Sequence, residues 1–192
     1  AVCVKQVPDS ETRIRLDGPA AELDRSGFTM VLNPYDAFAV EEAVKIKEAG
    51  EAEITVITVG PETVKETLKK DCLAVGCDKA VVVDDAALAG ADPFAVAQVL
   101  ATVLKRDQYD LVLFGIKAID DDASQVGVMT AELLAMPHVG YIGDLELGAG
   151  AAVVIELVAD PGGLAVLALQ FVPEEHGRLV AARVAQLREC FY

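Results

Sequence analysis

Apolar runs alternate with segments of helical periodicity through most of this chain. The runs lie at residues 1–7, 53–59, 79–83 and 111–114, and helical patterns alternate with them. Strands and helices that alternate in this way form a parallel sheet, because each helix returns the chain to the starting edge of the sheet. The pattern therefore predicts an α/β fold, a Rossmann-like parallel sheet flanked by helices.

Capping residues mark where the expected helices begin. Asn33 is a favourable N-cap and Pro34 suits a first helical turn, so one helix is expected from residue 34. Three more helices are expected at about 62–75, 93–105 and 123–135, each bounded by glycine, proline or polar residues. These helices would cover the faces of the sheet.

The connection before the first helix is unusually long, spanning residues 9–30. It is mostly polar, and residues 13–16 could pair with residues 28–31 as a β-hairpin. Connections of this length are often functional. We therefore expect an insertion rather than a simple loop.

The pattern changes after the fourth helix. Residues 139–147, 152–158 and 164–172 are expected to be strands separated by glycine-rich turns, and residues 174–190 a final helix. We therefore expect an α/β core at residues 1–138. The remainder, 139–192, would be a small β extension and C-terminal helix, continuous with the core.

Charge and hydropathy restrict the possible partners. The 192 residues include 31 acidic against 16 basic side chains, a formal charge of −15. Nucleic-acid binders need clustered lysine and arginine, so no nucleic-acid partner is expected. No apolar stretch approaches the roughly 18 residues of a membrane span, so no membrane insertion is expected. The strand-like beginning of the chain is unlike a signal peptide, which indicates a cytoplasmic protein.

The sequence offers little that suggests catalysis or a metal site. Its four cysteines have no CxxC spacing, and His138 and His176 lie far apart without flanking ligand motifs. No nucleophile is paired with a base. We therefore expect reduced thiols, no metal and no catalytic residue.

The strongest candidate site lies in residues 110–134, where an apolar strand runs through Gly115 into a polar loop and a helix. Main-chain amides opening that helix, near residues 123–125, would face any anion placed there. The same pattern also occurs as a plain connection in α/β proteins, and it is neither a Walker A nor a GxGxxG motif. Three consecutive carboxylates at residues 120–122 cannot all face one metal ion, so a solvated acidic turn is expected for at least two of them.

Six segments in order resemble the β subunit of electron transfer flavoproteins. They are VCVKQVPDS at 2–10, LNPYDAFAVEEAVKIKE at 32–48, ITVGP at 57–61, DCLAVGCDKAVVV at 71–83, GADPFAVA at 90–97 and LVLFGIKAIDDDASQVG at 111–127. The resemblance covers about residues 1–143. It implies an adenine-nucleotide-hydrolase-like core that binds FAD or AMP. It also implies a heterodimer with an α subunit, which carries electrons from flavin dehydrogenases to an acceptor.

The resemblance also implies a set of cofactor-binding residues at the ends of neighbouring strands. In this chain they are Cys3, Asn33, Pro34, Tyr35, Asp36, Val59, Gly115, Ile116, Lys117, Ala118, Ile119, Asp120, Asp121, Asp122, Ala123, Ser124, Gln125 and Val126. Asp120 or Asp122 could accept from a ribose hydroxyl, and Ser124 and Gln125 could donate to phosphate.

Features of two branches of the family are combined in the loop. AMP-binding members usually read AIDDDxNQTGQ, and this chain has Val126 in place of the threonine. Electron-bifurcating members, which hold a second FAD and react with NADH, usually read AIDGDTAQVGP, and this chain has Asp121 in place of the glycine. The first strand and helix are closer to the bifurcating branch, which favours FAD over AMP.

Two alternatives share the core topology. A stand-alone ATP- or AMP-binding module of the universal-stress-protein kind would normally carry a GxxGxxxxxxxxxG[ST] loop, and a nucleotide hydrolase would need a motif such as SGGxDS; neither motif is found. Residues 171–192 do not match the dehydrogenase-docking arm of electron transfer flavoproteins, so no docking residue is assigned here.

Overall fold

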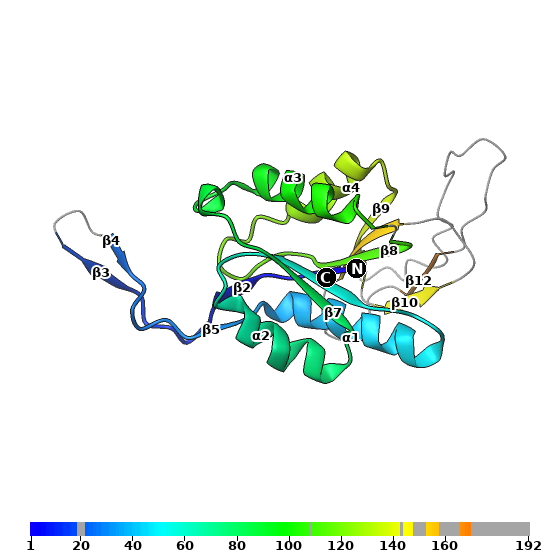
Figure 1. Ribbon diagram of the computed structural model, residues 1–192, viewed down its shortest axis with the longest axis horizontal. Helices are drawn as coiled ribbons and strands as arrows, with labels where there is room; N and C mark the ends of the chain where they lie inside the picture. The colour runs from blue at the N-terminus through cyan, green and yellow to red at the C-terminus, as the bar shows by residue number, and fades with distance from the viewer. Residues whose placement is uncertain (19–21, 108, 143, 148–152, 158–165, 170–192) are drawn as a thin grey trace, which may run out of the picture.

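A parallel six-stranded sheet forms the centre of the structure, a computed structural model that describes residues 1–18, 22–107, 109–142, 144–147, 153–157 and 166–169 (Figure 1). The spatial order of its strands is β7 (Lys79–Val83), β6 (Thr55–Val59), β1 (Val2–Cys3), β8 (Leu111–Gly115), β11 (Val153–Leu157) and β9 (His138–Ile142). Every neighbouring pair runs parallel. The predicted α/β fold class is thereby confirmed.

Helices cover both faces of this sheet (Figure 1). The elements are α1 (Pro34–Ala49) and α2 (Val64–Asp71) on one face, and α3 (Pro93–Leu104) and α4 (Val126–Leu134) on the other. Successive strand residues point to opposite faces, so Val56 packs into the α1–α2 core and Ile57 into the α3–α4 core. Two buried layers result, one on each side of the sheet.

The helix boundaries differ from the expected ones in two places. The second helix is shorter than expected, because α2 ends at Asp71 and a separate 3-10 turn, η1 (Leu73–Val75), follows before Gly76. The fourth begins at Val126 rather than near residue 123, since the preceding residues form a loop with left-handed backbone at Ser124. A further 3-10 turn, η2 (Ala86–Leu88), precedes α3.

The long connection folds into an arm that projects from the body (Figure 1). In it, β2 (Gln6–Pro8) pairs antiparallel with β5 (Met30–Leu32), and β3 (Arg15–Asp17) pairs with β4 (Glu22–Asp24). The expected pairing of 13–16 with 28–31 is therefore wrong. All of β3 is exposed, and an exposed strand lacks the buried face that fixes register from sequence.

Three strands were expected after the fourth helix, but the described residues form four, because the single strand expected at 139–147 is replaced by β9 and a separate strand that begins at Asp144. These four strands divide between two sheets. Two of them, β9 and β11, join the central sheet, while β10 (Asp144–Leu147) pairs in parallel with β12 (Val166–Leu169). The helix expected at 174–190 lies outside the described residues, and the division at residue 138 stays a prediction. None of the helices in the described ranges is both long and apolar enough to cross a membrane.

Candidate functional site

A pocket of about 190 Å³ lies at the carboxyl ends of β1, β6 and β8. From β1 the chain builds outward through β6 to β7, and then returns to place β8 on the other side of β1. The loops that leave β1 and β8 therefore diverge, and such a switch point is where open α/β sheets bind ligands. The topology explains why segments far apart in sequence meet at this pocket.

Most of the residues implied by the resemblance line the pocket. They are Cys3, Asn33, Asp36, Val59, Gly115, Ile116, Lys117, Ala118, Asp121, Ala123, Ser124, Gln125 and Val126. Pro34, Tyr35, Ile119, Asp120 and Asp122 do not line it. The Asp120 carboxylate instead contacts Lys5, and the Asp122 carboxylate contacts Lys117. Their expected role toward a ribose hydroxyl stays a prediction.

The sequence-based prediction missed two groups of lining residues. One group lies within two positions of predicted residues in sequence and consists of Val4, Lys5, Phe114 and Gly127. The other forms a wall before and along the first part of α3 and consists of Ala91, Pro93, Val96 and Leu100. The sequence contains a signal for this wall, because a helix that connects two parallel strands begins at the carboxyl edge of the sheet. The Asp92-Pro93 cap thus placed the first turn of α3 beside the site, where Asp92 Oδ1 accepts from the Ala95 N–H at 2.8 Å.

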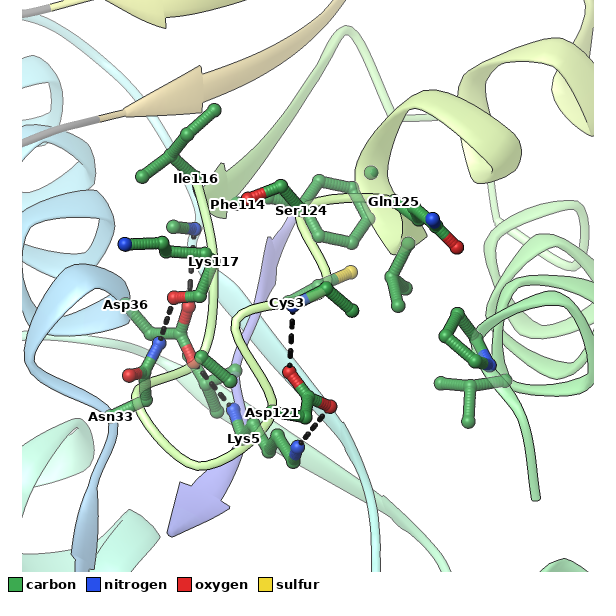
Figure 2. Close-up of a pocket in the computed structure, with 18 of the residues that line it drawn as sticks. Cys3, Lys5, Asn33, Asp36, Phe114, Ile116, Lys117, Asp121, Ser124 and Gln125 are labelled. Atoms are coloured by element: carbon green, nitrogen blue, oxygen red, sulfur yellow. Dashed lines mark hydrogen bonds and ion pairs between the residues drawn. The ribbon is translucent and has the colours of Figure 1, made fainter.

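Asn33 and Asp36 connect the start of α1 to both strand ends (Figure 2). The Asp36 carboxylate accepts the main-chain N–H of Lys5 at 2.7 Å and that of Gly115 at 3.1 Å. Asn33 donates through Nδ2 to the Lys117 carbonyl at 2.8 Å and accepts from the Ile119 N–H at 3.2 Å. Asn33 therefore occupies the N-cap position without using its side chain as the cap. Both side chains hold the pocket walls together.

Burial dominates the ionisation of the two titratable groups at the base of the pocket. It raises the pKa of Asp36 to about 7, although the amide donors of Lys5 and Gly115 oppose this shift. It also raises the pKa of the Cys3 thiol to about 12, so the thiol is protonated and a poor nucleophile at neutral pH. The geometry is suited to binding a ligand rather than to attacking one.

Gly115 is required by the close approach of β8 to α1. A Cβ at this position would lie 2.3 Å from Asp36 Oδ1, 2.6 Å from the Tyr35 carbonyl carbon and 2.7 Å from the Asp36 nitrogen. Two of these atoms belong to the backbone and cannot rotate away. Glycine thus allows the N–H to reach the Asp36 carboxylate.

Ion pairs hold the acidic loop on both sides. Lys5 Nζ lies 2.8 Å from Asp120 Oδ1 and 2.9 Å from Asp121 Oδ2. Lys117 Nζ lies 2.5 Å from Asp122 Oδ1 and 5.7 Å from the centre of the Tyr35 ring. The three carboxylates therefore have lysine partners. Among the described residues, no group of three or more metal-ligating side chains is found.

The end of the loop presents main-chain amides to the pocket. Asp122 and Ser124 adopt left-handed backbone, with φ of 54° and 49°, a conformation that costs non-glycine residues energy and is concentrated at ligand sites. The Ala123 N–H is satisfied by Asp121 Oδ1 at 3.1 Å. Within the described ranges, the amides of residues 124–128 have no hydrogen-bond partner. The free amides at the start of a helix favour the binding of an anion.

The fold and the pocket define a doubly wound α/β protein whose candidate ligand site is at the switch point. The model of the electron transfer flavoprotein domain matches residues 22–168. The chain belongs to the electron transfer flavoprotein family.

Named relatives agree with this assignment. The chain is 39% identical over 161 residues to an electron transfer flavoprotein subunit beta of Thermoanaerobacterium thermosaccharolyticum, covering 84% of this chain and 61% of the relative. It is 41% identical over 146 residues to the subunit of that name from Clostridium acetobutylicum, covering 76% and 56%. It is 40% identical over 161 residues to the caffeyl-CoA reductase-Etf complex subunit CarD of Acetobacterium woodii, covering 83% and 61%. The chain thus spans about three fifths of the relatives' length.

Proposed function

We propose that this chain is the β subunit of an electron transfer flavoprotein and binds the adenine-nucleotide part of FAD or AMP in the switch-point pocket. With an α subunit it would carry electrons from flavin dehydrogenases to an acceptor. The observation that supports this most is the set of free amides at 124–127, in residues that line the pocket at the start of α4. They would receive phosphate oxygens, while Cys3, Val59 and Phe114 offer apolar surface to the base.

FAD is the proposed nucleotide, in preference to AMP. Val126 cannot donate the hydrogen bond that a threonine would give to the phosphate of AMP, whereas a diphosphate could gather more of the free amides. Repulsion by an unpaired Asp121 would oppose FAD, but Asp121 is paired with Lys5 at 2.9 Å. This pairing removes the main objection to a diphosphate.

The size of the pocket supports a site completed by a partner chain. At about 190 Å³ it is smaller than the roughly 300–1,000 Å³ typical of pockets that enclose a small ligand. A nucleotide would therefore remain partly uncovered on this chain. We propose that an α subunit covers it, and that segment 139–172 supplies part of the interface.

The bound nucleotides of the heterodimer test this proposal. The complex co-expressed with its α subunit would be purified, and its nucleotides released and identified by mass spectrometry and absorption. Two FAD per heterodimer are expected, which would also favour electron bifurcation with NADH. One FAD with one AMP would overturn the FAD assignment alone. A stable, active, flavin-loaded homodimer of this chain would overturn the heterodimer proposal.

A further inference from the structure

Lys5 occupies a position that the resemblance does not assign to any role. It lies two residues after the end of β1, and its main chain is fixed at two points: its N–H donates to Asp36 and its carbonyl accepts from the Asn33 N–H at 2.9 Å. Its side chain then extends to the loop after β8, where Nζ contacts the carboxylates of Asp120 and Asp121. Figure 2 shows the contact with Asp121. Lys5 thus links the two strands on either side of the switch point.

We infer that Lys5 is a specificity-determining residue that lets the pocket accept a diphosphate, because its ammonium offsets the negative charge of Asp121 at the pocket wall and of Asp120 beside it. This inference rests on the proposed nucleotide site. Lys5 and Asp121 line the same pocket as Val126 and Gly127, whose amides are free to bind phosphate. An anion bound there would experience the charge of the loop directly.

The loop at residues 120–122 has more carboxylates than lysine partners, so its net charge depends strongly on Lys5. Three carboxylates at 120–122 are matched by two lysines, because Lys117 pairs with Asp122 and Lys5 serves the other two. Without Lys5, Asp121 in the pocket wall and Asp120 beside it would repel an incoming phosphate with no lysine to offset their charge. Repulsion grows with ligand charge, so a diphosphate should be affected more than a monophosphate.

Asp121 has a second contact that defines its orientation. Its Oδ1 accepts the Ala123 N–H at 3.1 Å while Oδ2 contacts Lys5, so Asp121 connects Lys5 to the residue before Ser124. Burial works against charge on this carboxyl, but the Lys5 ammonium and the Ala123 amide outweigh it and lower the pKa of Asp121. The carboxylate is therefore ionised when a ligand arrives.

The exposure of these ion pairs separates a role in nucleotide binding from a purely structural role. The side chains are 41%, 30% and 49% exposed for Lys5, Asp120 and Asp121 respectively, and ion pairs this exposed contribute little to stability. Loss of Lys5 should therefore leave the unfolding midpoint almost unchanged while nucleotide affinity falls. A structural role would change both together.

The experiment uses the complex of the full chain with its α subunit, stripped of nucleotide at this site and titrated calorimetrically with ADP and AMP. Lys5→Met should weaken ADP binding about tenfold or more, the change that about 1.4 kcal/mol produces, and weaken AMP binding less. Lys5→Met combined with Asp120→Asn and Asp121→Asn should recover most of the loss. Such recovery is expected of charge balance and not of a structural defect.

Matched variants separate the possible outcomes. Lys45→Met, which removes an exposed lysine that pairs with Glu41 and Glu42 on α1, should bind as the unsubstituted complex does. ADP binding by Lys5→Met within twofold of the unsubstituted complex, or no recovery in the combined variant, would overturn the inference about Lys5 alone. Binding of neither nucleotide by the unsubstituted complex would overturn the proposed site together with the inference.

A variant that keeps Lys5 provides an independent test. Asp121→Asn retains an oxygen to accept the Ala123 N–H and removes one negative charge. It should fold normally and bind ADP at least as tightly as the unsubstituted complex. If Lys5→Met does not fold, ADP binding by Asp121→Asn tests the inference in its place. Weaker ADP binding by Asp121→Asn than by the unsubstituted complex would contradict the inference.

Discussion

Replacing Gly115 with alanine should disrupt the junction between β8 and α1. The added Cβ would lie 2.3 Å from Asp36 Oδ1 and less than 3 Å from two backbone atoms of the first α1 turn. Either β8 or α1 must then move. The movement would also lengthen the 3.1 Å hydrogen bond from the Gly115 N–H to the Asp36 carboxylate.

The two effects set the size of the destabilisation. Overpacking a buried site costs about 1–3 kcal/mol, and losing a hydrogen bond to a charged group costs about 1.5–3 kcal/mol. Their sum is about 2.5–6 kcal/mol, and relaxation of α1 would bring the result toward the lower value. Because domains have only about 5–15 kcal/mol of stability, this is a large loss.

Urea unfolding of the full chain measures the effect against a matched glycine. Gly60 follows β6 at the same edge of the sheet, and a Cβ there would meet nothing within 4 Å. Gly60→Ala should therefore change stability by no more than about 0.5 kcal/mol. Equal unfolding midpoints for Gly115→Ala and Gly60→Ala would refute the steric argument. Unchanged nucleotide content in Gly115→Ala would refute the assignment of the loop to the site.

Three further substitutions test other contacts of the site. Asp36→Asn should remove a pH dependence of the unfolding free energy. Folding raises the pKa of the Asp36 carboxyl from 3.8 to about 7, so the protonated carboxyl stabilises the folded chain below pH 3.8, and this contribution is lost as the pH rises to about 7. The unfolding free energy of the unsubstituted chain minus that of Asp36→Asn should therefore fall between pH 5 and pH 8, and a constant difference would contradict this. Asn33→Ala should cost about 1–3 kcal/mol in urea unfolding, because the Lys117 carbonyl and the Ile119 N–H lose their partner; a cost below about 0.5 kcal/mol would argue against the bridge. Ser124→Ala and Ser124→Gly should both weaken nucleotide binding by about 1 kcal/mol, or by up to about 3 if the hydroxyl meets a charged phosphate. Both variants lack the hydroxyl, but only Ser124→Gly should also relieve the backbone strain at φ 49°. If only one of the two variants lost nucleotide affinity, the missing hydroxyl would not be the cause.

The sequence by itself determined the order of the core elements and the position of the candidate loop. Apolar periodicity located β6, β7 and β8, and the caps at Asn33 and Asp92 located the starts of α1 and α3. These signals come from residues that are close together in sequence, so they can be recognised from the sequence alone. The resemblance in the loop at 115–126 pointed to residues that mostly line one pocket.

Tertiary structure alone decided what the polar residues of the site contact. The Asn33 and Asp36 side chains join two strand ends, and Lys5 contacts carboxylates 115 and 116 positions away in sequence. The register of the outer strand β3 was likewise not predictable from the pattern, because this strand has no buried face to fix it. These contacts exist because parallel pairing sets β1 beside β8, and local propensity contains no information about which distant strands become neighbours.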